Sequence, residues 1–313
     1  MYLEKRRVKQ GTKYYLAHSF REGGKVLKIR VYLGTNLKKK VLAQRQEKAK
    51  ELLAQQVNSF KIIRSPINYK FSKHEIELIK SLKKRSKFKV FHLSEDDWQA
   101  FTELFTYNTN AIEGSTITQN EVFEILKENK WPFNKPKGEI SEAYGVAKAI
   151  LHIRKTKIHL SLKLIQDIHK TIFENSKAFA GKIREKGIEV GIRDGTGNLI
   201  HLGAPASRVI PLLVELVKWY SKNRSKIPAV VLGIVIHNQF EFIHPFEDGN
   251  GRVGRLLLNN ILLKHNLPPV NISLKNRKQY YSALKEFDRT GNIKPSIELV
   301  LKEYKSLRKK LKK

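Results

Sequence analysis

The sequence predicts a mainly α fold, with a β-hairpin inside the helical part and a small N-terminal region made of a β-hairpin and a helix. Apolar residues recur at helical spacing through most of the chain after residue 94. An alternating, glycine-rich stretch at residues 188–203 interrupts this pattern, as a hairpin would. A second glycine turn, between runs of β-branched and aromatic residues, lies close to the N-terminus.

The N-terminal hairpin is predicted from two alternating runs. KYYLAHS (Lys13–Ser19) and KVLKIRVYLG (Lys25–Gly34) flank a Gly-Gly pair, which favours a tight turn. Leu37–Val57 follows, with apolar residues at helical spacing and charges between them, and this indicates an amphipathic helix. A proline interrupts the next stretch. We therefore expect an accessory region at residues 1–60 and a linker or extended arm at residues 61–93.

The remaining chain is expected to form a helical domain at residues 94–300 and a basic tail at residues 301–313. Ser94 is a good N-cap, and the three acidic residues after it suit the positive end of a helix that stops at Gly114. Thr118 opens the next helix through a capping box. Further helices are expected near residues 138–154, 160–174, 207–222, 228–244, 252–265, 275–287 and 295–310.

Composition limits the classes of protein that this chain can belong to. The 313 residues include 61 Lys and Arg against 29 Asp and Glu, a formal net charge of +32 that favours association with polyanions. A solvated lysine-rich surface is the simpler explanation of that charge. Cysteine is absent, which excludes disulfides and thiolate sites. The longest apolar run, Ala229–Ile236, is far shorter than the ~20 residues of a membrane span. We expect a cytoplasmic protein with no secretory signal and no membrane partner.

Residues 244–255, HPFEDGNGRVGR, gather a histidine, two carboxylates, three glycines and two arginines in a short stretch. The part GNGRVG (Gly249–Gly254) matches the GxGxxG pattern of dinucleotide-binding folds. That fingerprint requires a strand directly before it and an acidic residue about 20 positions after it. An apolar helix precedes these glycines instead, and residues 270–275 hold no acid. We therefore reject a dinucleotide-binding fold.

A glycine loop that leads into a helix N-terminus is an anion site, because backbone N–H groups converge there and the helix dipole favours negative charge. Gly249 and Gly251 are expected to adopt positive φ and to let the backbone approach a phosphate closely. Arg252 and Arg255 share one helix face as bidentate phosphate donors. Asp248 suits Mg²⁺, which prefers a carboxylate together with phosphate oxygens.

His244 ends the preceding apolar helix and is expected to face the same cavity, where it is placed to take a proton from an incoming hydroxyl. Asn250 can add an amide donor for the phosphates, and Phe246 is expected to turn inward and anchor the loop. The sequence has no HExxH pattern and no Cys/His set, which argues against zinc hydrolysis. The residues alone therefore indicate a nucleotide-dependent transferase.

HPFEDGNGRVGR resembles the Fic motif, HPFx[D/E]GNGRxxR, at every fixed position. The resemblance extends over about residues 95–300 and includes IHKTIF (Ile168–Phe173), AGKIREKGIEVG and RKQYYSAL (Arg277–Leu284). It implies a Fic-type helical core with a β-hairpin flap, which transfers AMP from ATP to a Tyr, Thr or Ser hydroxyl of a protein. Gly251 stands where a kinase subgroup has lysine, and this favours AMP transfer.

The resemblance also implies a role for each residue of the motif. His244 is the catalytic base, and Asp248 binds the Mg²⁺ that bridges the α- and β-phosphates. The glycines, the asparagine and both arginines hold the phosphates. The implied ATP-binding positions in the motif are Asp248, Gly249, Asn250, Gly251, Arg252, Gly254 and Arg255.

The hairpin at residues 188–203 is similar to the family's flap, whose backbone would pair with a segment of the target protein. The resemblance places the first flap residues and one tyrosine of the Tyr280-Tyr281 pair beside the nucleotide. These implied positions are Ile188, Glu189, Val190, Gly191 and Tyr281.

TNAIEG (Thr109–Gly114) fits the family's inhibitory pattern [S/T]xxxE[G/N], in which the defined positions are Thr109, Glu113 and Gly114. The resemblance implies that Glu113 pairs with Arg255 and keeps this guanidinium from the γ-phosphate. The ordinary alternative is a carboxylate near a helix end. In some relatives such a glutamate also positions water for removal of AMP, so both reactions stay open.

We therefore expect an autoinhibited protein adenylyltransferase that uses ATP and Mg²⁺, acts on a hydroxyl of a target protein and can modify itself. The alternative is a nucleic-acid-binding regulator, in which residues 1–90 contact DNA or RNA and the Fic core is regulatory. A third interpretation treats the N-terminal segment as a docking or dimerisation element, which leaves a homodimer open.

Overall fold

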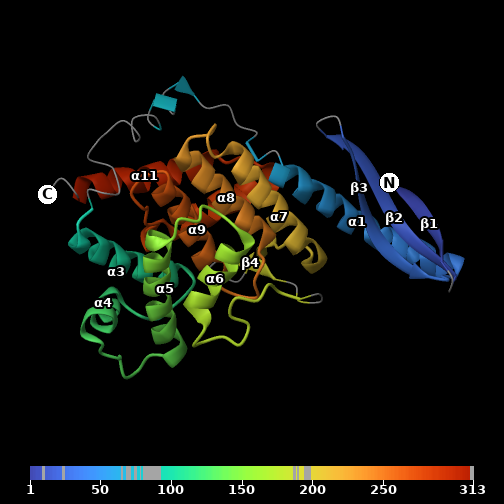
Figure 1. Ribbon diagram of the computed structural model, residues 1–313. Coiled ribbons are helices and arrows are strands. Elements are labelled where there is room, and N and C mark those ends of the chain that lie inside the picture. The colour runs from blue at the N-terminus through green and yellow to red at the C-terminus, as the bar shows by residue number, and fades with distance from the viewer. Residues whose placement is uncertain are drawn as a thin grey trace. The chain divides into compact units, whose positions relative to one another are not determined.

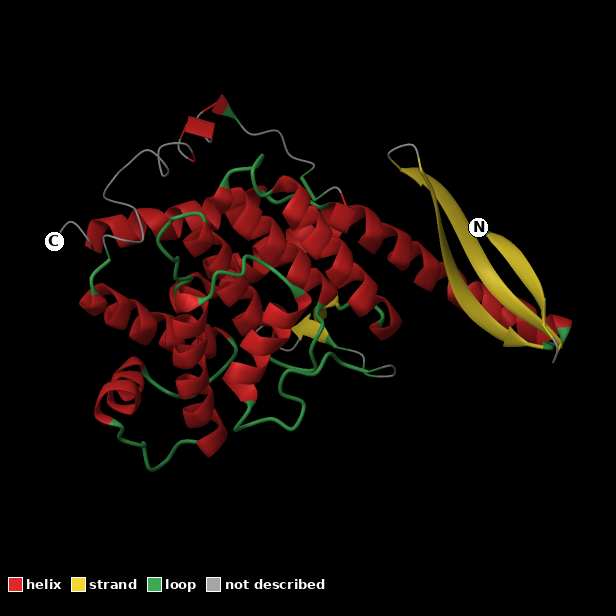
Figure 2. Ribbon diagram, in the orientation of Figure 1, coloured by secondary structure: helices red, strands yellow, loops and turns green. Residues whose placement is uncertain are grey.

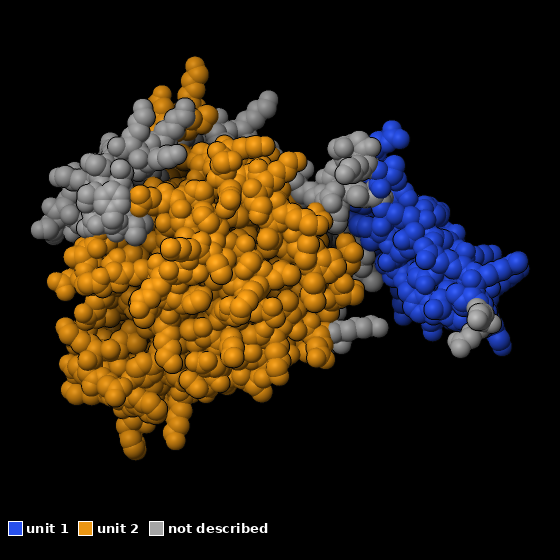
Figure 3. Space-filling view, viewed as in Figure 1, with its two compact units in different colours: residues 1–62 blue, residues 63–313 orange. Residues whose placement is uncertain are grey.

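The computed structural model describes residues 1–8, 11–22, 25–64, 66–67, 72–73, 76–77, 79, 93–185, 188, 190–193 and 199–310. These residues are mostly helical, with two small antiparallel sheets (Figures 1 and 2). The predicted mainly α fold is therefore confirmed. The chain divides into two compact units, residues 1–62 and residues 63–313, which Figure 3 colours separately. None of the described helices is both long and apolar enough to cross a membrane.

Unit 1 holds a three-stranded antiparallel sheet in the order β1-β2-β3. The strands are β1 (Tyr2–Val8), β2 (Gly11–Glu22) and β3 (Lys25–Thr35). The predicted hairpin is the β2–β3 pair. Strand β1 was not predicted, because its sequence YLEKRRV shows almost no apolar alternation, and most of its residues are exposed. It is an edge strand that depends on pairing with β2 rather than on a buried face.

Helix α1 (Lys39–Arg64) covers one face of this sheet. The apolar contact joins sheet and helix residues, namely Leu16, Ile29, Leu33, Ala49, Leu53 and Val57. The helix extends beyond the predicted end at Val57, into the region expected to be a linker or extended arm. Within that region the described residues 73, 76, 77 and 79 are also helical, so the extended conformation was wrong there. Buried isoleucines, Ile63 and Ile79, give this polar stretch apolar anchors.

Unit 2 is built of helices that overlap those predicted from periodicity. They are α3 (Glu95–Ile112), α4 (Gln119–Glu128), α5 (Lys137–Lys155), α6 (Leu162–Phe173), α7 (Ala206–Asn223), α8 (Ala229–Ile243), α9 (Asn250–Lys264), α10 (Arg277–Thr290) and α11 (Lys294–Lys310). Both predicted N-caps are present. The Ser94 and Thr118 hydroxyls accept the backbone N–H groups of Asp97 and Glu121 at 3.1 and 3.3 Å.

Helices α8 and α9 form the centre of unit 2 (Figure 1). Every residue of α8 from Val230 to Ile243 is buried, and α9 is buried from Asn250 to Leu262. The two helices approach closely at Gly233, where a Cβ would lie 2.7 Å from a Leu258 methyl. Helices α3, α5 and α6 pack on α9, while α7, α10 and α11 pack on α8. The loop between α8 and α9 is therefore held by two helices that are fixed on all sides.

The hairpin predicted inside the helical part is present. Strands β4 (Gly191–Arg193) and β5 (Leu199–Leu202) pair antiparallel, with Gly191 opposite Leu202. Strand β5 lies against α10. Residues 194–198, which include the predicted turn, lie outside the described residues.

Two glycines of α5 give a matched test of helix packing. A Cβ on Gly145 would lie 2.2 Å from the carbonyl oxygen of Ile172 in α6, whereas a Cβ on Gly138 would meet nothing within 4 Å. We expect Gly145→Ala to lower the free energy of unfolding by about 1–3 kcal/mol or more, because backbone atoms must move apart. Gly138→Ala should raise it by up to about 1 kcal/mol through helix propensity. Urea unfolding of both variants measures the two effects, and equal changes would contradict close α5–α6 packing.

Candidate active site

The loop between α8 and α9 begins with a strained turn. His244 caps the C-terminus of α8 in the left-handed conformation, with φ 52°, which is uncommon for a residue with a Cβ. Gly249 caps the N-terminus of α9 with φ +79°, and a Cβ there would lie 2.2 Å from the Phe173 ring. Glycine is therefore required at this position by both its backbone angle and the space around it. The two turns fold residues 244–249 into a tight loop over the N-terminus of α9.

The side chain of Asn250 closes this loop from within. Its Oδ1 accepts the Phe246 N–H at 2.9 Å, and its Nδ2 donates to the Phe246 carbonyl at 2.9 Å. Asn250 is 2% exposed, so these two bonds satisfy an amide that is almost fully buried. The sequence had suggested that this amide donates to phosphates. Its Oδ1 and one Nδ2 hydrogen hold the loop, the second Nδ2 hydrogen is not used by these bonds, and the phosphate contact stays a prediction.

His169 supports the loop from α6. Its ring stacks on Phe246 at 3.8 Å between centroids, and Phe246 is fully buried, as expected for an anchor. Nδ1 accepts the Gly181 N–H at 2.7 Å, so Nε2 carries the proton and donates to the Asp248 carbonyl at 3.1 Å. Burial lowers the pKa of His169 to about 4, which keeps the ring neutral in this arrangement.

Arg184 connects the catalytic loop to both ends of the flap. This buried guanidinium donates to the His244 carbonyl at 2.8 Å and to the Ile188 carbonyl at 3.0 Å, and it also donates to the Ala204 carbonyl. Its own backbone N–H bonds the Pro245 carbonyl at 3.0 Å. Arg184 therefore fixes the unusual backbone of His244 and the base of the hairpin in one set of hydrogen bonds.

A cavity of about 310 Å³ opens over this loop. It is lined from one side by the loop and the start of α9, and from the others by α3, the flap, α8 and α10. The lining residues are Glu113, Val190, Gly191, Glu241, His244, Glu247, Asp248, Gly249, Asn250, Gly251, Tyr280, Tyr281 and Leu284. Its position places the histidine, the glycine turn and the tyrosine pair around one open cavity.

The His244 ring is oriented by the end of its own helix. Nδ1 lies 3.2 Å from the Glu241 carbonyl oxygen. A carbonyl oxygen can only accept, so this contact puts the proton of the neutral ring on Nδ1 and makes Nε2 the acceptor nitrogen. The side chain is 12% exposed and lines the cavity. The ring is therefore arranged as a base toward a group that enters the cavity.

Glu241 is a buried carboxyl group next to this base. It is 3% exposed, and within the described part of the chain its Oε1 has no hydrogen-bond partner, nor has either ring nitrogen of neighbouring His237. Burial raises the pKa of Glu241 to about 8, against the opposing effect of Arg255, and burial lowers the pKa of His237 to about 3. Their contact at 3.9 Å is therefore between two neutral groups near neutral pH. Gly254 makes room for both, since its Cβ would lie 2.3 Å from Glu241 Oε1.

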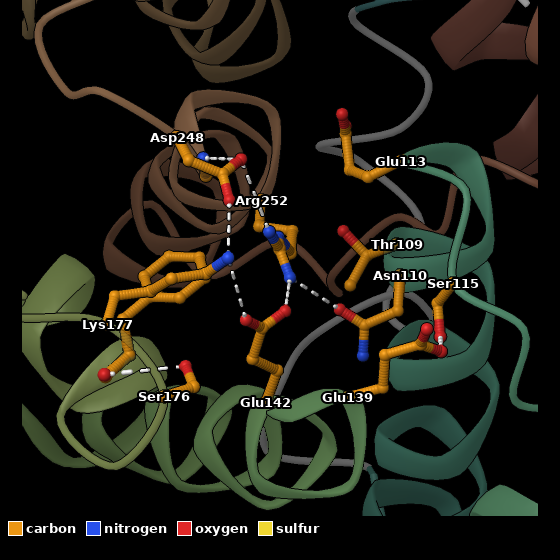
Figure 4. A network of polar contacts seen from close by, with 12 residues as sticks. Thr109, Asn110, Glu113, Ser115, Glu139, Glu142, Ser176, Lys177, Asp248 and Arg252 are labelled. Carbon is orange, nitrogen blue, oxygen red and sulfur yellow. Dashed lines mark hydrogen bonds and ion pairs between the residues drawn. The ribbon is translucent and has the colours of Figure 1, made fainter. Parts of the chain in front are cut away.

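Asp248 takes part in an alternating network of charges (Figure 4). Its Oδ1 accepts the Gly249 N–H at 2.6 Å, and its Oδ2 pairs with Lys177 Nζ at 3.2 Å. Lys177 also approaches Glu142 at 3.7 Å, and Glu142 pairs with Arg252. The Arg252 guanidinium lies 3.6 Å from Asp248 as well. Burial opposes the ionised form of Asp248, but Arg252 and Lys177 outweigh it and hold the pKa below its usual range.

Arg255 is engaged with the end of α3. Its Nη2 pairs with Glu113 at 2.7 Å, and its Nε donates to the Thr109 hydroxyl at 2.8 Å. Nη1 lies 3.2 Å from the Tyr280 hydroxyl. Arg255 is 1% exposed, whereas the Glu113 side chain is 30% exposed, so the pair lies at the cavity edge. Gly114, with φ +99°, ends α3 directly after this glutamate.

Gly251 has a different role from the one that its sequence suggested. It is a helical residue of α9, and positive φ is found at Gly249 alone among the glycines of this loop and helix. A Cβ on Gly251 would lie 2.2 Å from Glu113 Oε1 and 3.0 Å from Arg255 Nη1. The expected turn at Gly251 was therefore wrong. Its missing side chain instead creates the space that the Glu113 carboxylate fills.

The predicted site residues divide into three groups. Those that line the cavity are Glu113, Val190, Gly191, His244, Asp248, Gly249, Asn250, Gly251 and Tyr281. Others do not line it: Thr109, Ile188, Arg252, Gly254 and Arg255 lie behind its wall and hold the lining residues in place, and Gly114 is exposed at the end of α3. Glu189 lies outside the described residues. Arg252 and Arg255 lie on one side of α9, as predicted, but each is turned toward a carboxylate of a different helix.

Sequence reasoning missed several residues of this site. Lys177, Glu142 and Glu241 lie in unremarkable charged or apolar stretches, and only the fold brings them to the loop. Arg184 was part of a recognised segment, but nothing in one sequence shows that its guanidinium bonds carbonyl groups on both sides of the flap. Glu241 offered one signal, since a carboxylate in an otherwise apolar helix three residues before His244 is expensive to bury.

The geometry agrees with comparisons with known proteins. Residues 159–262 match the model of the Fic/DOC family. The chain contains a Fic domain. Its match begins just before α6 and ends within α9, and so includes the flap and the catalytic loop but neither Glu113 nor Tyr280.

Curated relatives of the Fic domain include "Protein adenylyltransferase fic-1" of Caenorhabditis briggsae, 29% identical over 206 residues. "Protein adenylyltransferase Fic" of Drosophila melanogaster is 29% identical over 201 residues. These matches cover 64% and 62% of this chain and 39% of each relative, so the chain spans about two fifths of the relatives that it matches.

Solved structures share the fold of the Fic domain and its surroundings. A fragment of Fic-1 from C. elegans superimposes with a TM-score of 0.62 at 21% identity, and covers 88% of this chain and 77% of its own. A Fic family protein from Desulfovibrio desulfuricans G20 gives a TM-score of 0.64 at 23% identity, over 78% of this chain and 76% of its own.

The buried carboxyl of Glu241 gives a pH test of the site. A pKa of about 8 in the folded chain, against an ordinary 4.5, means that the unfolded chain loses this proton first as pH rises. Stability should therefore fall between these two pH values because of Glu241. We expect Glu241→Gln to unfold at a higher temperature relative to wild type at pH 8.5 than at pH 5. Thermal melts at both pH values measure this.

The quantity compared is the difference in melting temperature between Glu241→Gln and wild type at each pH. This difference cancels the effects of titrating groups that both proteins share. The charged and titratable groups that face Glu241 are Arg255, Glu113, His237, His244 and Tyr280, and all are retained in the variant. A difference in melting temperature that does not change between pH 5 and pH 8.5 would show that Glu241 is already ionised in the folded chain.

Proposed function

We propose that this chain is a protein adenylyltransferase, which moves AMP from ATP to a hydroxyl group of a protein. The observation that carries this proposal is one cavity that holds His244, the glycine turn at the N-terminus of α9, and the Tyr280–Tyr281 pair. A helix N-terminus binds phosphate, aromatic rings bind an adenine, and an oriented imidazole accepts a proton. The curated relatives are named protein adenylyltransferases, which supports the same activity here.

The transfer follows from these positions. The target hydroxyl oxygen attacks the α-phosphorus of ATP and its proton passes to His244 Nε2. The new O–P bond forms as the bond to the β-phosphate oxygen breaks, and pyrophosphate leaves with the electron pair. The first N–H groups of α9, at Asn250 and Gly251, face developing negative charge on the phosphates. Catalysis then rests mainly on positioning and on charge stabilisation.

The carboxylate of Asp248 fits a divalent cation in this reaction. Its side chain is 46% exposed and lines the cavity beside the N-terminus of α9. Within the described residues, no group of three or more His, Asp or Glu could hold a metal by itself, so the other ligands would be phosphate oxygens and water. That donor set suits Mg²⁺. When bound, the ion would neutralise charge on the phosphates next to the breaking bond.

The flap offers a place for the target protein. Strand β4 pairs with β5 on one side and with no other strand of the described sheet, while β5 lies against α10, so the second edge of β4 is open to a further strand. An extended segment of the target that pairs with β4 would lie next to the cavity, since Val190 and Gly191 line it. We propose that the target presents its Tyr, Thr or Ser hydroxyl to His244 from such a segment.

We further propose that Glu113 inhibits the reaction. It pairs with Arg255 at 2.7 Å and occupies the space above Gly251 at the first turn of α9. A polyphosphate bound at this helix end would need both that guanidinium and that space. The Glu113 carboxylate and a phosphate cannot both occupy this space beside Arg255, because the two anions would repel each other. Glu113 is half-buried near the end of α3 and can leave without unfolding the core.

The test of both proposals is AMP incorporation from labelled ATP with Mg²⁺. We expect Glu113→Gly to increase incorporation, including self-modification, by tenfold or more, since ~1.4 kcal/mol of lost competition already gives that factor. His244→Ala in the same protein should abolish it. Mass spectrometry of the product identifies the modified residue and the nucleotide transferred.

Glu139→Gln is a matched control for Glu113. The Glu139 carboxylate accepts hydrogen bonds from Ser115 and Thr116, which directly follow helix α3. It does not contact Arg255. The variant should label like wild type. Equal labelling by Glu113→Gly and wild type would refute inhibition alone, while the absence of labelling in both would refute adenylyl transfer. Release of AMP from purified modified protein, compared in wild type and Glu113→Gly, tests hydrolytic removal of AMP.

Lys177 provides a test of the cation site. Its ammonium neutralises Asp248 at 3.2 Å, so it competes with a divalent ion for the same carboxylate. We expect Lys177→Met to bind Mn²⁺ about three- to tenfold more tightly, from ~1 kcal/mol of lost competition at a partly exposed site. Titration of Mn²⁺, followed by electron paramagnetic resonance, measures this directly. Lys148→Met, which removes an equivalent charge paired with Glu174, should change nothing. Weaker binding by Lys177→Met would contradict the competition.

A further inference from the structure

The N-terminal sheet has a second face, opposite helix α1. The pairing register places Tyr2, Ala17 and Arg30 in one row across the three strands, and Glu4, Tyr15 and Tyr32 in the next. Side chains alternate along a strand, so this set points away from the apolar contact with α1. Among the described residues of unit 1, no helix or strand packs on this face. We call it the outer face.

The outer face is rich in cations and tyrosines. Its basic residues are Arg6, Lys13, Arg21, Lys28 and Arg30, its tyrosines are Tyr2, Tyr15 and Tyr32, and its one acidic residue is Glu4. Tyr2 and Tyr32 are 44% and 53% exposed. Residues 1–62 hold sixteen Lys and Arg against four Glu, so a fifth of the chain carries +12 of the net +32. The charge excess is therefore concentrated in this unit rather than spread evenly.

The cations of the outer face are held in place. Glu4 pairs with Arg6 at 2.7 Å, with Arg30 at 3.1 Å and also with Lys28. Lys28 lies over the Tyr2 ring at 5.1 Å, and Arg6 lies over Tyr15 at 5.3 Å. A single carboxylate thus gathers three cations without neutralising them, and the net charge of this cluster stays positive. Such preorganisation lowers the cost of ordering long side chains when they bind an anion.

The geometry points to double-stranded DNA as the partner of the outer face. Phosphates match its net charge, and Arg, Lys and Tyr are common donors to the DNA backbone. Three strands at a spacing of ~4.8 Å make a face about 10 Å wide, which suits the ~12 Å major groove. The deep, narrow major groove of RNA would not admit it. Tyr15 and Tyr32 are tilted by 50° to each other, which is poor for stacking successive bases of a single strand.

This inference is independent of AMP transfer, since no residue of the cavity takes part. It assigns unit 1 as a DNA-binding module. Unit 1 would hold the Fic domain on DNA and so limit where that domain meets its target proteins. The assignment also explains why an edge strand as polar as β1 is kept in the sheet. Strand β1 contributes Tyr2, Glu4 and Arg6 to the face.

Fluorescence anisotropy of the full chain with labelled 25-base-pair DNA tests the inference. We expect the triple variant Arg6→Ala, Lys28→Ala, Arg30→Ala to lose about tenfold or more in affinity for DNA at 100 mM salt. The slope of its plot of log affinity against log salt should become shallower by about 2–3. His244→Ala should bind like wild type.

The matched control removes the same charge from the opposite side of unit 1. Lys39, Lys40 and Lys48 are exposed on α1, which covers the other face of the sheet. Their triple alanine variant should lose less than about threefold in affinity. Equal losses of affinity in the two triple variants would show that DNA binds the positive charge of unit 1 in general and not its outer face. That result would overturn the inference. Tighter binding of single-stranded DNA or of duplex RNA, or no binding by wild type, would overturn it too. Far-UV circular dichroism confirms that each variant is folded.

Discussion

The close packing of α8 against α9 is the constraint on which the rest of the site depends. Gly233 and Gly254 let the two helices approach, and the tight connection between them then forces a left-handed turn at His244 and a second at Gly249. The same approach buries the loop against Phe173 and His169, which a looser pair of helices would leave in water. A strained histidine backbone persists because the surrounding contacts overdetermine it, and strain of this kind is typical of functional sites.

The buried guanidinium groups of Arg252 and Arg255 set the electrostatics of the site. They differ in how easily another anion can replace the carboxylate that pairs with each. Taking an arginine out of water costs several kcal/mol unless an acceptor satisfies it. Arg252 is matched by Glu142 of α5, whose side chain is 11% exposed and also approaches Lys177. Arg255 is matched by Glu113, which lies at the end of α3 and is partly exposed. An anion that enters the cavity can therefore exchange with Glu113, while the Arg252 pair stays as part of the core.

Much of this architecture could be predicted because it is local. Ser94 and Thr118 begin helices through their own hydroxyls, Gly114 ends one through its positive φ, and a glycine turn between alternating runs defines a hairpin. Strand β1 could not be predicted, because its stability comes from pairing and not from its own pattern. The same reason explains Lys177 and Arg184, whose partners in the loop, Asp248 and His244, lie about 70 and 60 positions away in the chain. The error at Gly251 is instructive: a glycine can be required by a neighbour's side chain rather than by its own φ.

The Glu113–Arg255 contact, which we propose to be inhibitory, depends on the space left at Gly251. The oxygen of Glu113 lies where a Cβ of residue 251 would be, at the first turn of α9, where helix N–H groups lack internal partners. A carboxylate there satisfies the same positive field that would otherwise attract phosphate. The Glu113 carboxylate thus occupies the anion-binding position at the start of α9, as an anion supplied by the chain itself. The absence of a side chain at 251 leaves room for the Glu113 carboxylate, and it would leave the same room for the proposed nucleotide, so under our proposal the two compete for a single space.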